Sequence, residues 1–408
     1  MANAIPVYAD NQAAKGFGIG KTVELFRRFA YVEQSCVRAL AGWFLRVPAW
    51  EAKIKLGYYL YAHAERAHEL TGRLEEMRGG HRDANIEPAL DRAGEEIVHA
   101  PDERGFMSGL AVVLRRQADV YRAYLAAANP AANATEIRLL HRLLADVERE
   151  IADIAAFGSV NPASAEEPGN AWGLYLGSLF DAAGGIACSE SRSGALLPRP
   201  GNERFDWTVP MTFDERIRGD EFGSYESKLA LPLRERCIGE FEVYFNELYA
   251  AAIAASVIAD SWRISAPRQY FMDIAHHFWD EVRHSEFGAI RLLEHGVVPD
   301  KANMMLFEQS RNMPLLHRYC YLTLGLEIFF MPRKSVRTRY YEEQGDVLST
   351  LFADVDWSDE MNHVRYGKKW VDHFLQDDHR TVEDVQAEIS QYLENLNKHL
   401  PEGKKAPW

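Results

Sequence analysis

The chain has 408 residues, of which 47% are hydrophobic and 26% charged, and its formal net charge is −14. This length is ample for two hydrophobic cores, and the negative charge argues against nucleic acid and against an anionic membrane surface as partners. No apolar run approaches the roughly 18 residues that cross a bilayer, and the N-terminus has no basic region followed by an apolar stretch, so we expect neither a membrane span nor a signal peptide.

The cysteines indicate the redox compartment. Cys36, Cys188, Cys237 and Cys320 lie far apart in the sequence and form no CxxC pair. Their spacing argues against a rubredoxin-type iron site and against a disulfide framework. We therefore expect a protein of the reducing cytoplasm.

The first part of the chain predicts a four-helix unit over residues 21–158, preceded by a loose leader over residues 1–20. Apolar residues recur every three or four positions from residue 21, which is the helical period. Further helices are expected over residues 50–78, 106–127 and 135–157. Gly79-Gly80 and Asn129-Pro130 are turn residues and separate these segments.

Residues 159–235 interrupt the helical pattern with frequent glycine, proline and serine. So long a stretch without strong elements is unusual within a compact protein. It also holds too many aromatic side chains for a disordered linker, namely Trp172, Tyr175, Phe180, Phe205 and Trp207. We interpret the segment as an ordered excursion packed on the helical units, with an interface or an active-site lid as its candidate roles.

A second four-helix unit is predicted over residues 236–378. Its helices are expected at residues 237–262, 267–295, 315–341 and 345–375. Pro299 and Pro314 fall between them, where a proline interrupts no helix. Residues 379–408 follow as a short polar helix and a basic-tipped tail.

One sequence motif, E-x-x-H-x-x-x-G, occurs three times. The copies run from Glu65 to Gly72, from Glu281 to Gly288 and from Glu360 to Gly367. Glu and His three apart lie on one face of an α-helix, so each copy places a carboxylate beside an imidazole. A single ExxH is expected by accident in a chain of this size, whereas three copies with the same trailing glycine are a repeat.

A lone glutamate precedes each copy by 32 to 34 residues, at Glu33, Glu247 and Glu327. Glu327 interrupts an aromatic and aliphatic run, and Glu247 precedes the small apolar run 248–255. A bare charge there costs several kcal/mol to desolvate, so an ionised carboxylate needs a partner. Solvated Glu/His pairs on a helix surface would explain the ExxH copies but not these two glutamates, whereas a shared metal ion would explain both.

Glu, ExxH, Glu and ExxH on four inward-facing helices are the ligand set of ferritin-like di-iron and di-manganese proteins. From residue 247 to residue 363 this sequence resembles that superfamily, the ferritin-like di-metal carboxylate proteins. The resemblance implies an all-α fold of two ferritin-like four-helix bundles in tandem, joined by the irregular aromatic-containing segment. The metal ligands that it implies are Glu247, Glu281, His284, Glu327, Glu360 and His363.

By the same resemblance, Glu281 and Glu360 would bridge two metal ions, Glu247 and Glu327 would be terminal ligands, and each histidine would bind one ion. The implied cofactors are two iron ions, with manganese or a mixed Mn/Fe pair as the alternative, and O2 as co-substrate. Two aspartates precede the bridging glutamates and would either hold ligand histidines or nearby arginines in place or form a solvated acidic face; they are Asp280 and Asp359.

The first unit carries only part of such a site. Its candidate ligands are Glu33, Glu65 and His68. In the register of the recurring glycine, the places of the missing second ExxH fall on Ile151 and Ile154, which cannot bind a metal. A register shifted by one residue would offer acidic side chains instead, Asp119, Glu150 and Asp153. We expect this unit to hold no metal or one weakly bound ion, with Glu65 and His68 satisfied by hydrogen bonds.

Three functional hypotheses follow. The first is a non-haem di-iron oxidase or oxygenase that activates O2 to oxidise a small organic substrate. The alternatives are a metal- or peroxide-handling protein (a ferroxidase, catalase or peroxidase) and a scaffold whose site is vestigial. Storage ferritins are single short bundles that assemble into shells, so a tandem bundle with a long excursion favours the first hypothesis. The missing CxxC motif implies an external reductase or a substrate that supplies its own electrons; a homodimer is left open.

Overall fold

The computed structural model describes residues 16–79, 86–160, 169–188, 195–207, 209–213, 215–218 and 225–400. Within these ranges the chain is all-α, as predicted, and the one strand-like feature is an isolated bridge between Arg218 and Lys301. Most of the predicted leader, residues 1–15, and the end of the basic-tipped tail, residues 401–408, lie outside the described ranges.

The chain divides into two compact units. Unit 1 comprises Met1–Ala39 and Ala62–Trp207, and unit 2 comprises Leu40–Tyr61 and Thr208–Trp408. This division differs from the predicted one, because residues 40–61, at the tip of the first helical hairpin, pack with the second half of the chain. The rings of Phe44 and Phe278 meet edge to face with centroids 5.0 Å apart, and the Trp50 indole donates a hydrogen bond to the Ser285 hydroxyl at 3.1 Å.

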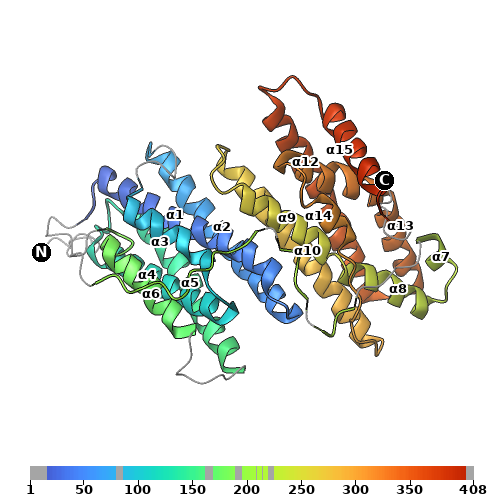
Figure 1. Ribbon diagram of the computed structural model, residues 1–408, viewed down its shortest axis with the longest axis horizontal. Helices are drawn as coiled ribbons and strands as arrows, with labels where there is room; N and C mark the ends of the chain where they lie inside the picture. Colours follow the sequence, from blue (N-terminus) through green and yellow to red (C-terminus); the bar gives the residue numbers. More distant parts are fainter. Residues whose placement is uncertain are drawn as a thin grey trace, which may run out of the picture. The chain divides into compact units, whose positions relative to one another are not determined.

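Unit 1 takes parts of the first two helices and the helices that follow them (Figure 1). In chain order these are α1 (Ile19–Arg46), α2 (Trp50–Glu76), α3 (Pro88–Glu96), α4 (Glu103–Ala127), α5 (Ala134–Val160) and α6 (Gly169–Ala183). The start of α4 shows how local sequence fixes a helix end. The Asp102 carboxylate accepts the Gly105 backbone N–H at 2.7 Å, which satisfies one of the free amides of the first turn.

The predicted irregular excursion is partly helical. Helix α6 lies against α3 and α4, and it buries Trp172, Tyr175, Leu176 and Phe180. These side chains follow the helical period, which the frequent glycines and prolines nearby concealed in the sequence. Because they fill the core of unit 1, their contacts give no support to the predicted lid over an active site.

Unit 2 contains the helices after residue 208, which include one π-helical segment, η3. In chain order they are α7 (Tyr225–Leu229), α8 (Leu233–Phe245), α9 (Leu248–Asp260), α10 (Arg268–Glu294), α11 (Met305–Ser310), α12 (Leu315–Cys320), η3 (Tyr321–Glu327), α13 (Ile328–Gln344), α14 (Val347–Leu375) and α15 (Val382–Asn397). The predicted helices of this unit coincide with these elements. However, residues 237–262 are divided between α8 and α9, and residues 315–341 contain η3.

Helix α10 lies against α8, α9 and α14, and α14 also lies against η3 and α13 (Figure 1). One stretch of the described chain, Leu233–Asp260, which covers α8 and α9, is long and apolar enough to cross a membrane by composition. Within the fold, 83% of its apolar window is buried, which is the behaviour of a core helix. The centre of unit 2 is therefore enclosed by α8, α9, α10, η3, α13 and α14.

Candidate metal centre

The six predicted metal ligands of unit 2 come together in its interior. The ExxH pairs lie on α10 and α14, where the three-residue spacing turns both members of each pair inward. Two further side chains join them, His277 and Asp356, which precede Glu281 and Glu360 by four residues. The full motifs are therefore H-x-x-x-E-x-x-H on α10 and D-x-x-x-E-x-x-H on α14, with all members of each on one helix face.

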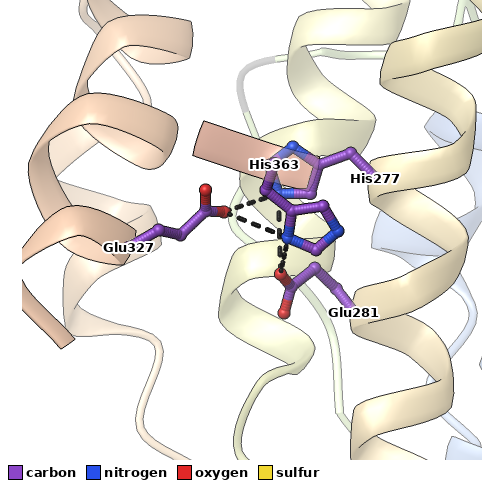
Figure 2. A group of neighbouring side chains, drawn as sticks. All are labelled: His277, Glu281, Glu327 and His363. Carbon is purple, nitrogen blue, oxygen red and sulfur yellow. Dashed lines mark ion pairs between the residues drawn. The ribbon is translucent and has the colours of Figure 1, made fainter. Parts of the chain in front are cut away.

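The eight side chains form two groups, each with ligand atoms within 4.8 Å of one another. The first group consists of His277, Glu281, Glu327 and His363 (Figure 2). Nε2 of His277 lies 2.7 Å from Oε1 of Glu327, and Nδ1 of His363 lies 3.3 Å from Oε1 of Glu281. The imidazoles of His277 and His363 stack with their ring centroids 3.9 Å apart.

The second group consists of Glu247, His284, Asp356 and Glu360. Nδ1 of His284 lies 3.0 Å from Oε2 of Glu247 and 3.7 Å from Oδ1 of Asp356. Glu281 connects the two groups, because its Oε1 faces His363 whereas its Oε2 lies 3.7 Å from Nδ1 of His284. Its two oxygens are thus directed to different groups, as a bridging carboxylate requires.

The donor atoms of both groups fit metal ions. Buried polar atoms normally have hydrogen-bond partners. Among the described residues, atoms that face the two groups have no hydrogen bond of normal geometry, although several are close ion-pair neighbours of one another: Oε2 of Glu247, Oε1 of Glu281, Nδ1 of His284, both carboxylate oxygens of Glu327, Oε2 of Glu360 and Nδ1 of His363. Imidazole nitrogens and carboxylate oxygens that converge in this way offer lone pairs that two cations would accept.

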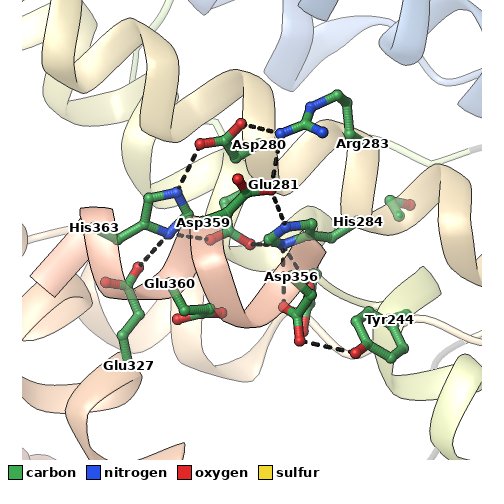
Figure 3. Close-up of polar contacts among 12 residues, drawn as sticks. Tyr244, Asp280, Glu281, Arg283, His284, Glu327, Asp356, Asp359, Glu360 and His363 are labelled. Carbon is green, nitrogen blue, oxygen red and sulfur yellow. Dashed lines mark hydrogen bonds and ion pairs between the residues drawn. The ribbon is translucent and has the colours of Figure 1, made fainter. Parts of the chain in front are cut away.

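Outer carboxylates hold two of the ligand histidines from behind (Figure 3). Asp280 on α10 accepts from Nε2 of His363 on α14 at 3.0 Å, and Asp359 on α14 lies 3.2 Å from Nε2 of His284 on α10. The Arg283 guanidinium donates to both aspartates. These contacts cross between the helices and direct each Nδ1 inward, which is the orienting role predicted for both aspartates.

Replacing either outer carboxylate by an amide should weaken one metal position selectively. Asp280→Asn is expected to lower affinity for the ion held by His363, and Asp359→Asn for the ion held by His284, each by about 10–100-fold. Equilibrium dialysis of Mn²⁺ against each variant measures this. Asp354→Asn, on the exposed face of α14, is the control and should bind as the unmodified protein does. Equal affinities in all three variants would contradict the orienting role.

The buried charges in this centre strongly influence one another. Burial alone would raise the pKa of Glu281 and of Glu327, but His277 and His363, with His284 acting on Glu281 as well, lower both below their ordinary values. Burial raises the pKa of Glu360 to about 8; the charges of Glu327 and Glu281 act in the same direction and Lys334 in the opposite one. Glu360 therefore binds a proton at neutral pH in the metal-free protein, and a divalent ion beside it would take the place of that proton.

Metal-free protein is expected to lose stability as pH rises from about 5 to about 8. The folded state raises the pKa of Glu360, so the stability linked to its proton disappears across this window. Burial lowers the pKa of His284 and His363, but their carboxylate partners raise it well above the ordinary value. The stability that comes from these protonated histidines is therefore also lost as the pH rises above about 6.5. Melting temperatures of the chelator-treated protein check the slope; a steady rise over this range would contradict it.

Both lone glutamates of unit 2 lie at irregularities in their helices. Glu247 lies in the break between α8 and α9, where it is the N-cap of α9, and Glu327 is the last residue of the π-helical segment η3. Such segments often mark functional sites because they redirect a side chain that a regular helix would place elsewhere. The recurring glycines of the repeat face these same segments. A Cβ on Gly288 would lie 2.1 Å from the backbone nitrogen of Phe245, and one on Gly367 would lie 2.2 Å from Oγ1 of Thr323.

Gly288→Ala is therefore expected to destabilise unit 2 by about 1–3 kcal/mol, because the new methyl group meets backbone atoms of α8 that cannot rotate away. Gly239→Ala in α8 is the matched control, since its added Cβ would meet its nearest neighbour, Lys228, at an ordinary 3.5 Å. Urea denaturation of both variants measures the difference. Equal midpoints for the two variants would show that α10 and α8 can separate at no cost.

The predicted half-site of unit 1 is not assembled. Glu33 is fully buried, but Glu65 is exposed and His68 is half-buried, so the three residues do not converge. The inward positions of α2 belong instead to His63 and Arg66. The repeat in α2 thus lies on a different helix face from the copies in α10 and α14.

Arg66 takes the central place in unit 1. Its Nε donates to Glu33 at 2.9 Å and its Nη2 donates to Glu150 at 2.9 Å, while His63 also lies between the two carboxylates. Glu150, which the shifted register offers as a ligand, is buried, whereas Asp119 is exposed and pairs with surface Arg122. The Arg66 guanidinium pairs with both buried carboxylates, and among the described residues of unit 1 no group of side chains is arranged to hold a metal ion.

Two side chains of the unit 2 groups and one neighbour were not predicted from the sequence. His277 and Asp356 lie one helical turn before a predicted ligand, so the i−4 spacing was a usable signal. Lys334 contacts the second group from α13, and no motif pointed to it. No protein-family model, no curated protein and no solved structure matches this chain, so the assignment of the centre rests on its own geometry.

Proposed function

We propose that unit 2 holds two metal ions and that the protein is an O2-dependent oxidase or oxygenase of the ferritin-like di-metal carboxylate superfamily, acting on a small organic substrate. One observation carries the proposal. Eight buried side chains, three imidazoles and five carboxylates, converge in two adjacent groups that share Glu281. This donor set is of the kind that iron and manganese use in such proteins.

Each group would hold one ion. His277, Glu327 and His363 would bind the first, Glu247, His284, Asp356 and Glu360 the second, and Glu281 would reach both. No thiolate is among these ligands, which favours iron or manganese over zinc. When bound in the reduced state, the two ions supply electrons for the reduction of O2.

The residues of this chain exclude water and fix the ligands. Tyr244 donates to Oδ2 of Asp356 at 2.8 Å, and this leaves Oδ1 directed to the second group. Tyr249 is half-buried and follows Glu247 closely in the chain, and burial followed by the charges of Glu247 and Glu281 raises its pKa, so it stays protonated. A centre made of buried side chains suits oxidation chemistry because burial protects reactive species from water.

Anaerobic loading with ferrous iron, followed by exposure to O2, tests the function. We expect about two retained iron ions per chain and a transient optical signal that decays faster with the organic substrate. Glu294→Ala, on the exposed side of α10, is the control and should behave like the unmodified protein. Retention of tens of iron ions per chain would overturn the oxygenase proposal in favour of ferroxidase and storage activity. The external reductase, the cytoplasmic location and a homodimer stay predictions.

A further inference from the structure

Lys334 on α13 is a buried cation inside the second ligand group. Its side chain is 5% exposed, and its Nζ lies 2.7 Å from Oδ1 of Asp356, 2.8 Å from Oε1 of Glu360 and 3.7 Å from Oε1 of Glu247. The ammonium thus contacts three of the four side chains that would bind the second metal ion. Among the described residues, no lysine or arginine forms an ion pair with the first group, so the two groups differ in this respect.

Unit 1 shows the same use of a side-chain cation. Arg66 there holds Glu33 and Glu150 with hydrogen bonds of 2.9 Å each, and all three side chains are buried. The guanidinium is a rigid fork with fixed donors, whereas a lysine ammonium is a point charge on a flexible four-carbon stem. A buried lysine can therefore withdraw from a carboxylate cluster more readily than an arginine.

We propose that Lys334 occupies the second metal position in the metal-free protein and competes with the metal ion for it. This proposal rests on the two-metal centre proposed above, and it means that the two positions differ in their affinity for metal. The first group, which among the described residues pairs with no lysine or arginine, fills first. The second ion binds only as the ammonium withdraws, because the ammonium occupies Oδ1 of Asp356, the oxygen that faces the second group, and also holds Oε1 of Glu360.

The local backbone of α13 allows that withdrawal. Lys334 lies two residues after Pro332, which removes a backbone N–H from the helix, and the π-helical segment η3 precedes α13 directly. The Tyr244 ring offers an aromatic face nearby, with its centroid 5.8 Å from Nζ. An ammonium that leaves the carboxylates keeps a favourable cation–π contact at this ring.

Titration with Mn²⁺ under anaerobic conditions tests the competition without any O2 chemistry. Chelator-treated protein is titrated by calorimetry, and bound metal is counted after equilibrium dialysis. We expect two binding steps in the unmodified protein and a second dissociation constant at least about tenfold lower in Lys334→Met, since one bound competitor is removed. Lys334→Gln, which keeps a hydrogen-bonding group without the charge, gives the same result if the methionine variant does not fold.

Two further variants sharpen the test. Lys334→Arg retains the cation and is expected to keep the second step weak, and Lys369→Met removes a half-exposed lysine of unit 2 that pairs with Asp273 and should change neither step. A second step that is unchanged or weaker in both Lys334→Met and Lys334→Gln, with the first step intact, would overturn the proposal. Unmodified protein that binds no Mn²⁺ would overturn the two-metal centre itself, an outcome distinct from a failure of the oxygenase activity.

Discussion

The double variant Glu281→Ala, Glu360→Ala is expected to lose most of its bound metal. Glu281 directs one oxygen to each ligand group, and Glu360 is a member of the second group, so the pair serves both positions. The remaining ligands would be left without the residue that connects them. Metal content of purified protein, measured by elemental analysis after growth in iron-rich medium, gives the result directly.

A melting curve of the metal-free protein separates this loss from unfolding. The Glu281 carboxylate pairs with three buried histidines, which hold its pKa below the ordinary value, so its removal is expected to lower the melting temperature of the metal-free double variant without abolishing the cooperative transition. Glu294→Ala is again the control on the same helix. Full metal occupancy in the double variant would show that the two groups are not the metal centre.

Arg66→Ala should produce the largest loss of stability in unit 1, about 3–5 kcal/mol. Burial alone would raise the pKa of Glu33 and Glu150, and the charges of Arg66 and His63 lower both below the ordinary value. Without the guanidinium, two fully buried carboxylates would depend on His63 alone. Denaturant unfolding at pH 7 measures the change in the free energy of unfolding.

A surface arginine provides the comparison. Arg122 pairs with Asp119 and Glu148 on the exposed side of unit 1, so Arg122→Ala should change the free energy of unfolding far less than Arg66→Ala does. Removing both buried carboxylate charges as well, in Arg66→Met with Glu33→Gln and Glu150→Gln, should recover part of the loss. If the Arg66→Ala and Arg122→Ala variants unfold at the same denaturant concentration, the buried cluster contributes no more to the free energy of unfolding than a surface ion pair does.

The convergence of the six predicted residues in unit 2 could be predicted because two local signals agreed. The ExxH spacing shows which residues share a helix face, and the apolar runs around Glu247 and Glu327 show that these carboxylates are buried. In unit 1 only the first signal was present. Glu65 and His68 have the right spacing but lie on the wrong face of α2, and spacing alone does not say which face of a helix is inward.

Other features depend on contacts between distant segments. The tip of the first hairpin, residues 40–61, belongs to unit 2 through partners more than 200 residues away, such as Phe278. The local periodicity of a sequence does not indicate which distant segment a helix packs against. The position of Lys334 relative to Asp356 and Glu360 also depends on η3, because a π-helical turn changes the register of every later residue in the helix.

The cross-linked hydrogen bonds between α10 and α14 divide the centre into a rigid half and an adaptable half. Asp280 and Asp359 each hold a histidine of the opposite helix, so a slide of one helix along the other would break both contacts at once. Glu247 and Glu327 come from interrupted helices, and among the described contacts neither is held by an outer aspartate as the two histidines are. A change in the radius or charge of a bound ion would therefore be absorbed by shifts of these two carboxylates, while the imidazoles keep their positions.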